Sequence, residues 1–363
     1  MKKIILLATV AAVVFASRAD TTENEKATAM KKLDFNVLFV GFKPTDFINC
    51  FAAVHTCLGG AQEKNDDLFF LFDTLSGRNS IRYRFDGKPT EMETLIGDLV
   101  SDEANDGTDY TVDFLFGFAG YEHRKITEPD AFKAAIVASI DAGRPIIAKV
   151  KTGKGRFRVI IGYDGDNLLE PSYENSLRWH PRSTEAITYG AMEALHIVGD
   201  KIKPRYTLVD GLERIRRVME YNADEKIWGS FLEKLTFPHA AQKGDGWDDA
   251  DTEERKTRMK RLASNGWTMN AYSFASGFRN PVFKELQNPE LDELLGRITF
   301  IYGETFDLDY SLIAIAECAN WGHRAYEGGF VGTIVQLAIE KIQKNEEEVL
   351  EIVKRAIEIC EQQ

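Results

Sequence analysis

Apolar and polar positions are arranged in two different ways along this chain. From residue 30 to about residue 205, short apolar runs alternate with turn residues, and from residue 206 onward apolar positions recur at helical spacing. Short runs bounded by Gly, Pro, Asn and Asp are typical of strands, whereas the 3.6-residue period indicates helices. The sequence therefore predicts an α+β fold with two parts, an α+β domain over residues 30–205 and an all-α helical domain over residues 206–363.

The clearest local pattern lies in the middle of the chain. Residues 128–143 predict a helix, because a Pro stands at its start, apolar residues recur at helical spacing and Gly143 follows its end. The apolar runs 143–150 and 156–163 then predict the two strands of a hairpin. Gly165 fits the tight turn that follows, because Gly adopts positive φ without steric cost.

Other segments predict further elements. A helix is expected to begin near Phe47 and to end at Gly59, since Gly commonly follows the last helical turn. The alternating segment 33–43 favours a strand, residues 112–126 favour an aromatic-rich strand and turn, and residues 193–208 favour two strands.

Composition narrows the class of function. The chain has 363 residues and a net charge of −12, which argues against nucleic-acid binding because that needs basic patches. The four cysteines are too few for a disulfide scaffold. No His-x-x-x-His or Cys-x-x-Cys spacing occurs, so neither a metal nor another cofactor is expected.

The N-terminus has the pattern of an export signal. A basic start, MKK, precedes an apolar stretch and small residues, and residues 1–29 are therefore interpreted as a signal peptide and spacer. This predicts a secreted or periplasmic protein with no integral membrane segment after signal removal. A translation start at Met30 is the alternative, and it predicts a cytoplasmic protein.

The hairpin block carries a family resemblance. It reads GRPIIAKV, then RFRVIIGYDGDN, then an acidic residue before Pro171. With a Cys-led helix about a hundred residues earlier, it resembles the papain-like cysteine peptidase superfamily. Within that superfamily it resembles the bacteriocin-leader (double-glycine) peptidases and the N-terminal domain of butirosin biosynthesis protein H. Their hairpin pattern is G-x-P-h-I…H-h-h-h-h-h-G-Y-D…D-P, where h is apolar, and its His position falls on Arg156.

The resemblance implies a triad that is incomplete in this chain. Cys50 takes the nucleophile position in the first turn of its helix, where the helix dipole favours a thiolate. Glu170 takes the position of the carboxylate that orients an imidazole. Arg156 cannot serve as the base, because a guanidinium stays protonated. His123 is the leading candidate to replace the missing imidazole, and His180 and His196 lie beyond the hairpin.

Three functions are consistent with these patterns. The first is a papain-like domain that has lost peptidase chemistry and binds a peptide or a small metabolite. The second is an active thiol hydrolase or acyl/amide transferase that uses Cys50 with a non-standard His. The third is a protein-interaction scaffold, and the oligomeric state is left open. The expected binding residues are Asp46, Asn49, Arg156, Arg158, Tyr163 and Asp164.

Overall fold

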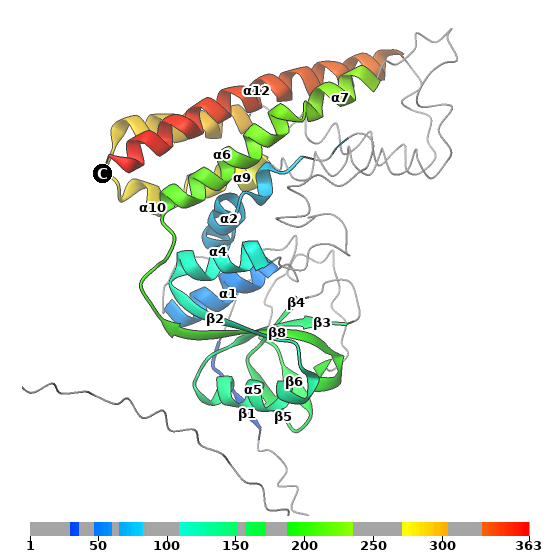
Figure 1. Ribbon diagram of the computed structural model, residues 1–363, viewed down its shortest axis with the longest axis vertical. Helices are drawn as coiled ribbons and strands as arrows, with labels where there is room; N and C mark the ends of the chain where they lie inside the picture. Colours follow the sequence, from blue (N-terminus) through cyan, green and yellow to red (C-terminus); the bar gives the residue numbers. More distant parts are fainter. Residues whose placement is uncertain are drawn as a thin grey trace, which may run out of the picture.

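The computed structural model describes residues 30–35, 47–59, 65–82, 84, 109–151, 157–171, 187–234, 271–303 and 329–362. These residues form both helices and antiparallel sheets, so the protein is α+β. Figure 1 shows the sheets at one end of the molecule and the long helices α6 and α12 at the other.

The described strands form two four-stranded sheets with the orders β2-β8-β3-β4 and β1-β5-β6-β7. Every pair of neighbouring strands in them is antiparallel. The strand bounds are β1 Lys31–Lys32, β2 Tyr121–Ile126, β3 Ile146–Val150, β4 Phe157–Ile160, β5 Gly162–Asp164, β6 Asn167–Leu169, β7 Ile187–Thr188 and β8 Met192–Lys201, and a 3-10 turn, Tyr189–Ala191, precedes β8.

Both faces of the β2-β8-β3-β4 sheet are covered by helices. α1 (Phe47–Gly59) and α4 (Asp109–Ala119) pack on one face, and α5 (Pro129–Asp141) packs on the other (Figure 1). Because side chains alternate along a strand, Ile147 joins the core under α1 whereas Ile146 joins the core under α5. This double cover explains why β3 is buried along its whole length.

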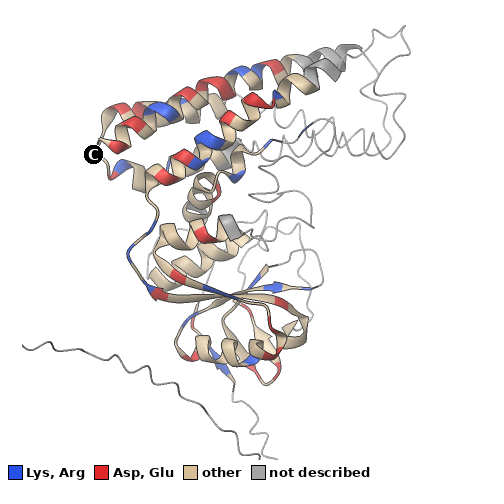
Figure 2. Ribbon diagram, viewed as in Figure 1, with Lys and Arg blue, Asp and Glu red and all other residues tan. Residues whose placement is uncertain are grey.

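The helical part has charged residues of both signs along α6 and α12 (Figure 2). A capping box formed by Thr207 and Asp210 begins α6, and it satisfies backbone N–H groups that the first helical turn leaves unpaired. The bounds are α2 Asn65–Leu75, the 3-10 turn Arg78–Ser80, α6 Leu208–Asp224, α7 Ile227–Lys234, α9 Ala271–Phe278, α10 Pro281–Lys284, a helix over residues 289–303 and α12 Gly329–Glu361.

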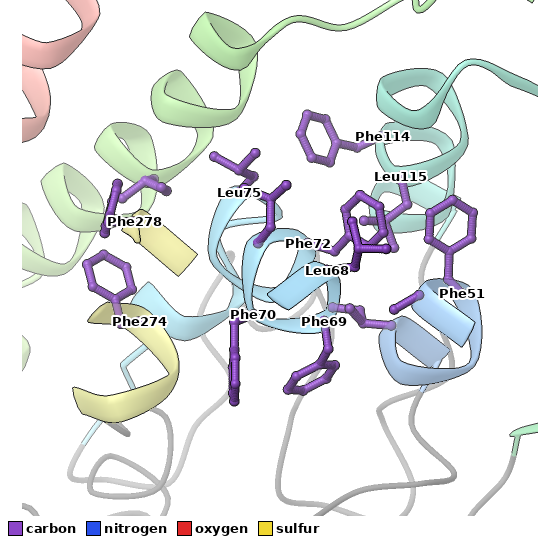
Figure 3. Close-up of a cluster of buried hydrophobic side chains, with 14 of the residues drawn as sticks. Phe51, Leu68, Phe69, Phe70, Phe72, Leu75, Phe114, Leu115, Phe274 and Phe278 are labelled. Atoms are coloured by element: carbon purple, nitrogen blue, oxygen red, sulfur yellow. The ribbon is translucent and has the colours of Figure 1, made fainter. Parts of the chain in front are cut away.

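One apolar core connects the sheet part to the helical part. Figure 3 shows α2 in the middle of it, with Phe72 directed toward α1 and α4 and with Phe274 and Phe278 of α9 on its other side. The same cluster continues to Leu212 of α6 and to Val353 of α12. Apolar packing is therefore continuous across the boundary that the sequence pattern places between residues 205 and 206.

Several local predictions are confirmed. The helix over residues 128–143 is α5, and the hairpin strands are β3 and β4. Gly143 and Gly165 have φ values of 78° and 59°, as expected for the residue after a helix and for a turn residue. α1 begins at Phe47 and ends at Gly59.

Two predictions are wrong. Residues 112–119, expected to begin a strand, belong to helix α4 (Asp109–Ala119), and only residues 121–126 form a strand. Most positions of residues 112–119 are apolar, so their pattern does not distinguish a buried helix from a strand. The second strand expected within residues 193–208 is absent, because β8 is one continuous strand to Lys201 and α6 begins at Leu208. Most of the predicted strand over residues 33–43 lies outside the described residues.

Candidate functional site

The first turn of α1 is completely enclosed. Phe47, Ile48, Asn49 and Cys50 expose at most 1% of their surface. The Cys50 thiol is thus inside the protein, although its position in the helix would favour a thiolate. Cys57, two turns later on the same helix, forms no disulfide, and burial raises its pKa to about 12.

Two histidines lie on the sheet face that α1 and α4 cover. In the β2–β8 register His123 is opposite Val198, and His196 is opposite Lys125, so the two imidazoles are diagonal neighbours. His123 Nε2 and His196 Nδ1 are 3.1 Å apart, which is a hydrogen bond whose donor depends on the tautomers. The two rings are stacked with an interplanar angle of 13°.

Aromatic rings surround this imidazole pair. Phe116 of α4 stacks on His123 with the ring centroids 4.3 Å apart. Phe47, the first residue of α1, meets His196 edge-on at 5.0 Å, and Phe157, the first residue of β4, lies 6.1 Å from the same ring. The pair is therefore a small polar centre within an aromatic shell to which α1, α4 and β4 contribute.

Burial determines the charge state of His196. The side chain has 0% exposure, and desolvation lowers its pKa to about 3, with further lowering by the charges of His123, Lys125 and Lys149. His196 is accordingly a neutral imidazole at pH 7. Its Nε2 atom is buried and has no hydrogen-bond partner among the described residues. Inside the aromatic shell, Nε2 is therefore a donor or an acceptor, depending on the tautomer, that makes no hydrogen bond to the described residues.

Glu170, the carboxylate expected to orient an imidazole, is paired with an arginine instead. Glu170 follows β6 and forms an ion pair with Arg158 of β4 at 3.5 Å, with side-chain exposures of 19% and 12%. Arg158 also donates a hydrogen bond to the Phe157 carbonyl. Its guanidinium therefore places a fixed positive charge beside the carboxylate. Arg156 lies outside the described residues.

The remaining predicted binding residues do not gather at one point. Tyr163 belongs to the core under α5, and its hydroxyl donates to Asp141 at 3.3 Å. Asp164 is exposed at the β5–β6 turn, and Asn49 is buried in α1. Asp46 lies outside the described residues.

The strongest feature of the site is one that the sequence pattern did not select. His196 stands between the apolar residues Leu195 and Ile197 in β8, and only its register with β2 pairs it with His123. Alternation within the strand would have placed it on the same face as Ala194 and Val198. The pairing of His196 with His123 depends on the order of the strands in the sheet, and no local sequence pattern gives that order.

The described residues contain no group of three or more His, Cys, Asp or Glu side chains arranged to hold a metal ion. Among them, no helix combines the length and apolar character needed to cross a membrane. In comparisons with known proteins, neither a protein-family model nor a curated protein sequence matches the chain.

Proposed function

We propose that this protein has a papain-like domain without peptidase activity that binds a peptide or a small metabolite at the His123–His196 pair. The observation that carries the proposal is the part-buried His123–His196 pair inside an aromatic shell, in which the buried Nε2 of His196 has no partner among the described residues. Small-molecule sites are commonly built from aromatic walls and a few polar groups, and a buried polar atom without a partner calls for a ligand or another explanation.

Three features of the candidate catalytic residues support binding without peptidase chemistry. Cys50 has 0% exposure, and a reactive cysteine must be reached by its substrate. His196, with a pKa of about 3, is too weakly basic to take a proton efficiently near pH 7. Glu170 is paired with the guanidinium of Arg158.

A thermal-shift screen against short peptides and small polar metabolites tests the binding function. A ligand that raises the melting temperature of the wild-type protein should lose this effect in His196→Gln. His55→Gln is the matched control, because His55 also has a pKa lowered to about 4 and an unpartnered buried nitrogen among aromatic rings, but lies outside the His123–His196 pair. Equal ligand shifts in the two variants would place the binding site elsewhere.

An active thiol enzyme is the second candidate. Phe47 contacts His196, and Cys50 is three residues further along α1, so an imidazole lies close to the helical turn that holds the thiol. Hydrolysis of peptide or acyl substrates that disappears in Cys50→Ala would establish this function.

Alkylation of the folded protein separates the two candidates. Iodoacetamide treatment followed by peptide mapping should show Cys50 unmodified in the native state and modified after unfolding. Rapid labelling of native Cys50 at pH 6 would instead indicate an accessible thiolate, as the enzyme requires. Cys57 serves as the internal reference, because its raised pKa predicts slow labelling at that pH.

A further inference from the structure

The segment over residues 30–35 is bound to the protein as an added strand. In β1, Lys31 is opposite Tyr163 and Lys32 is opposite Gly162 of β5. The Leu33 N–H then donates to the Ile161 carbonyl at 2.8 Å. β1 is the edge of its sheet, so without this segment β5 would present its own backbone groups at the edge.

Side chains on both sides fit this strand closely. Lys31 Nζ forms an ion pair with Asp141 at 2.7 Å, and Leu33 packs against both the core under α1 and the core under α5. A Cβ atom at Gly162 would overlap the Lys31 carbonyl oxygen and lie 2.8 Å from the Lys32 Cα. The absence of a side chain at residue 162 is therefore what allows the backbone of the segment to approach.

The segment is also held by few contacts. β1 is two residues long, Met30 is 63% exposed, and the ion pair of Lys31 with Asp141 is open to solvent. Short exposed ladders open locally without global unfolding, and exposed ion pairs contribute little to stability. The edge of β5 is therefore a site from which a bound strand can leave.

We propose that the β5 edge is a binding site for an extended peptide in trans, which residues 31–35 occupy in cis. The peptide pairs with β5 through its backbone, places a basic residue beside Asp141 and places an aliphatic residue two positions later where Leu33 lies. This is strand addition, in which main-chain hydrogen bonds provide affinity and alternate side chains provide selectivity. The inference rests on the proposed function for the class of ligand, a peptide, and assigns it a site on a different sheet from the imidazole pair.

Exchange at this edge is measurable in the full chain. A protease site inserted directly after Phe35 lets the protein fold intact before it is cut. The intact chain supplies its own segment at high effective concentration, so a free peptide competes poorly until the covalent link is removed. A fluorescent peptide of sequence MKKLDF should then bind the cut protein about 100-fold more tightly than the uncut protein.

Sequence variants test the contacts that define the site. A peptide with Glu at the Lys31 position or Asp at the Leu33 position should bind at least about tenfold more weakly. Asp141→Asn in the protein should remove the preference for the basic residue. Asp166→Asn is the matched control, because Asp166 is an exposed acid near the same sheet that pairs with Lys133 instead.

Gly162→Ala provides a second way to displace the segment without cutting the chain, and increased hydrogen exchange of residues 31–33 reports the displacement.

Failure of the peptide to bind after cleavage, or a cut segment that never exchanges with excess peptide, would overturn the inference. A dimer formed by exchange of residues 31–35 between two copies would also overturn it, in favour of self-association. In samples where the peptide does not bind at β5, the thermal-shift screen is repeated with wild-type protein and His196→Gln. A ligand that still raises the melting temperature, and loses that effect in His196→Gln, would show that the proposed function holds and that only the β5 site is wrong.

Discussion

A buried guanidinium in the helical part and a buried imidazole in the sheet part of this protein are accommodated in opposite ways. In the helical part, the guanidinium of Arg82 is 1% exposed and binds Glu346 at 2.5 Å, and Trp228 donates to the same carboxylate at 2.6 Å. In the sheet part, His196 is equally buried and keeps one nitrogen without a partner among the described residues.

The difference follows from the chemistry of the two side chains. A guanidinium cannot lose its proton in a protein, so a buried Arg must be paired with an anion. An imidazole escapes the same cost by becoming neutral, which is why burial lowers the pKa of His196 to about 3. The buried charge links distant segments of the chain through its ion pair, whereas the neutral imidazole needs no counter-ion.

The largest predicted effect comes from breaking the buried ion pair. Arg82→Met should lower the free energy of unfolding by about 3–5 kcal/mol, because it leaves the Glu346 carboxylate without its buried partner. Arg84→Met, which removes an exposed pair with Glu225 at 2.7 Å, should cost only about 0–1 kcal/mol. Urea denaturation of both variants measures the two values. Equal losses would contradict the contrast between paired and solvent-exposed charges.

The pH dependence of stability tests the other half of the comparison. The unfolded His196 has an ordinary pKa of 6.5 and the folded one about 3, so the unfolded state binds the proton first as the pH falls. Stability should be present in full above pH 6.5 and be lost as the pH decreases toward 3. One such group accounts for about 3 kcal/mol between pH 6.5 and pH 4.

Urea denaturation of wild-type protein and His196→Gln at several pH values isolates this contribution. The difference between the two unfolding free energies should shrink or change sign as the pH falls through this window. Two parallel curves would show that His196 does not become charged on unfolding.

Packing between α9 and α2 gives a smaller effect within the helical part. A Cβ at Gly277 would overlap the Thr74 side chain and lie 2.7 Å from the Phe70 carbonyl oxygen, so Gly277→Ala should cost about 1–3 kcal/mol. Gly296→Ala is the control, since no atom lies within 4 Å of the added Cβ. It should stabilise its helix by up to about 1 kcal/mol, because Ala has the higher helix propensity. Thermal unfolding shifts of opposite sign are the expected result.

The smallest predicted effect concerns the start of α6, where the chain passes from the sheet part to the helical part. Thr207→Ala removes the side chain that accepts from the Asp210 N–H and should cost about 1 kcal/mol. Thr188→Ala is a matched control, because Thr188 precedes a 3-10 turn and makes no capping hydrogen bond. Denaturant midpoints that change equally in both variants would argue against a capping contribution at α6.

Local patterns were sufficient for elements whose limits depend on neighbouring residues. α5 was predicted from its Pro start and from Gly143, and the β3–β4 hairpin from apolar runs on either side of a turn. The same reasoning failed for residues 112–119, because an almost continuous apolar run has neither a strand nor a helix period. The helix there is the outcome of packing on α1 and the sheet.

The sequence alone determined the α+β class, the position of Cys50 in the first turn of its helix and the net negative charge. These depend on residue type and on contacts within a few residues. Only the tertiary structure decided that Cys50 is enclosed, that His123 pairs with His196 across 73 positions and that Arg82 meets Glu346 across 264. The physical reason is that burial and pairing depend on which strands and helices become neighbours, and that choice is made by the packing of the whole core.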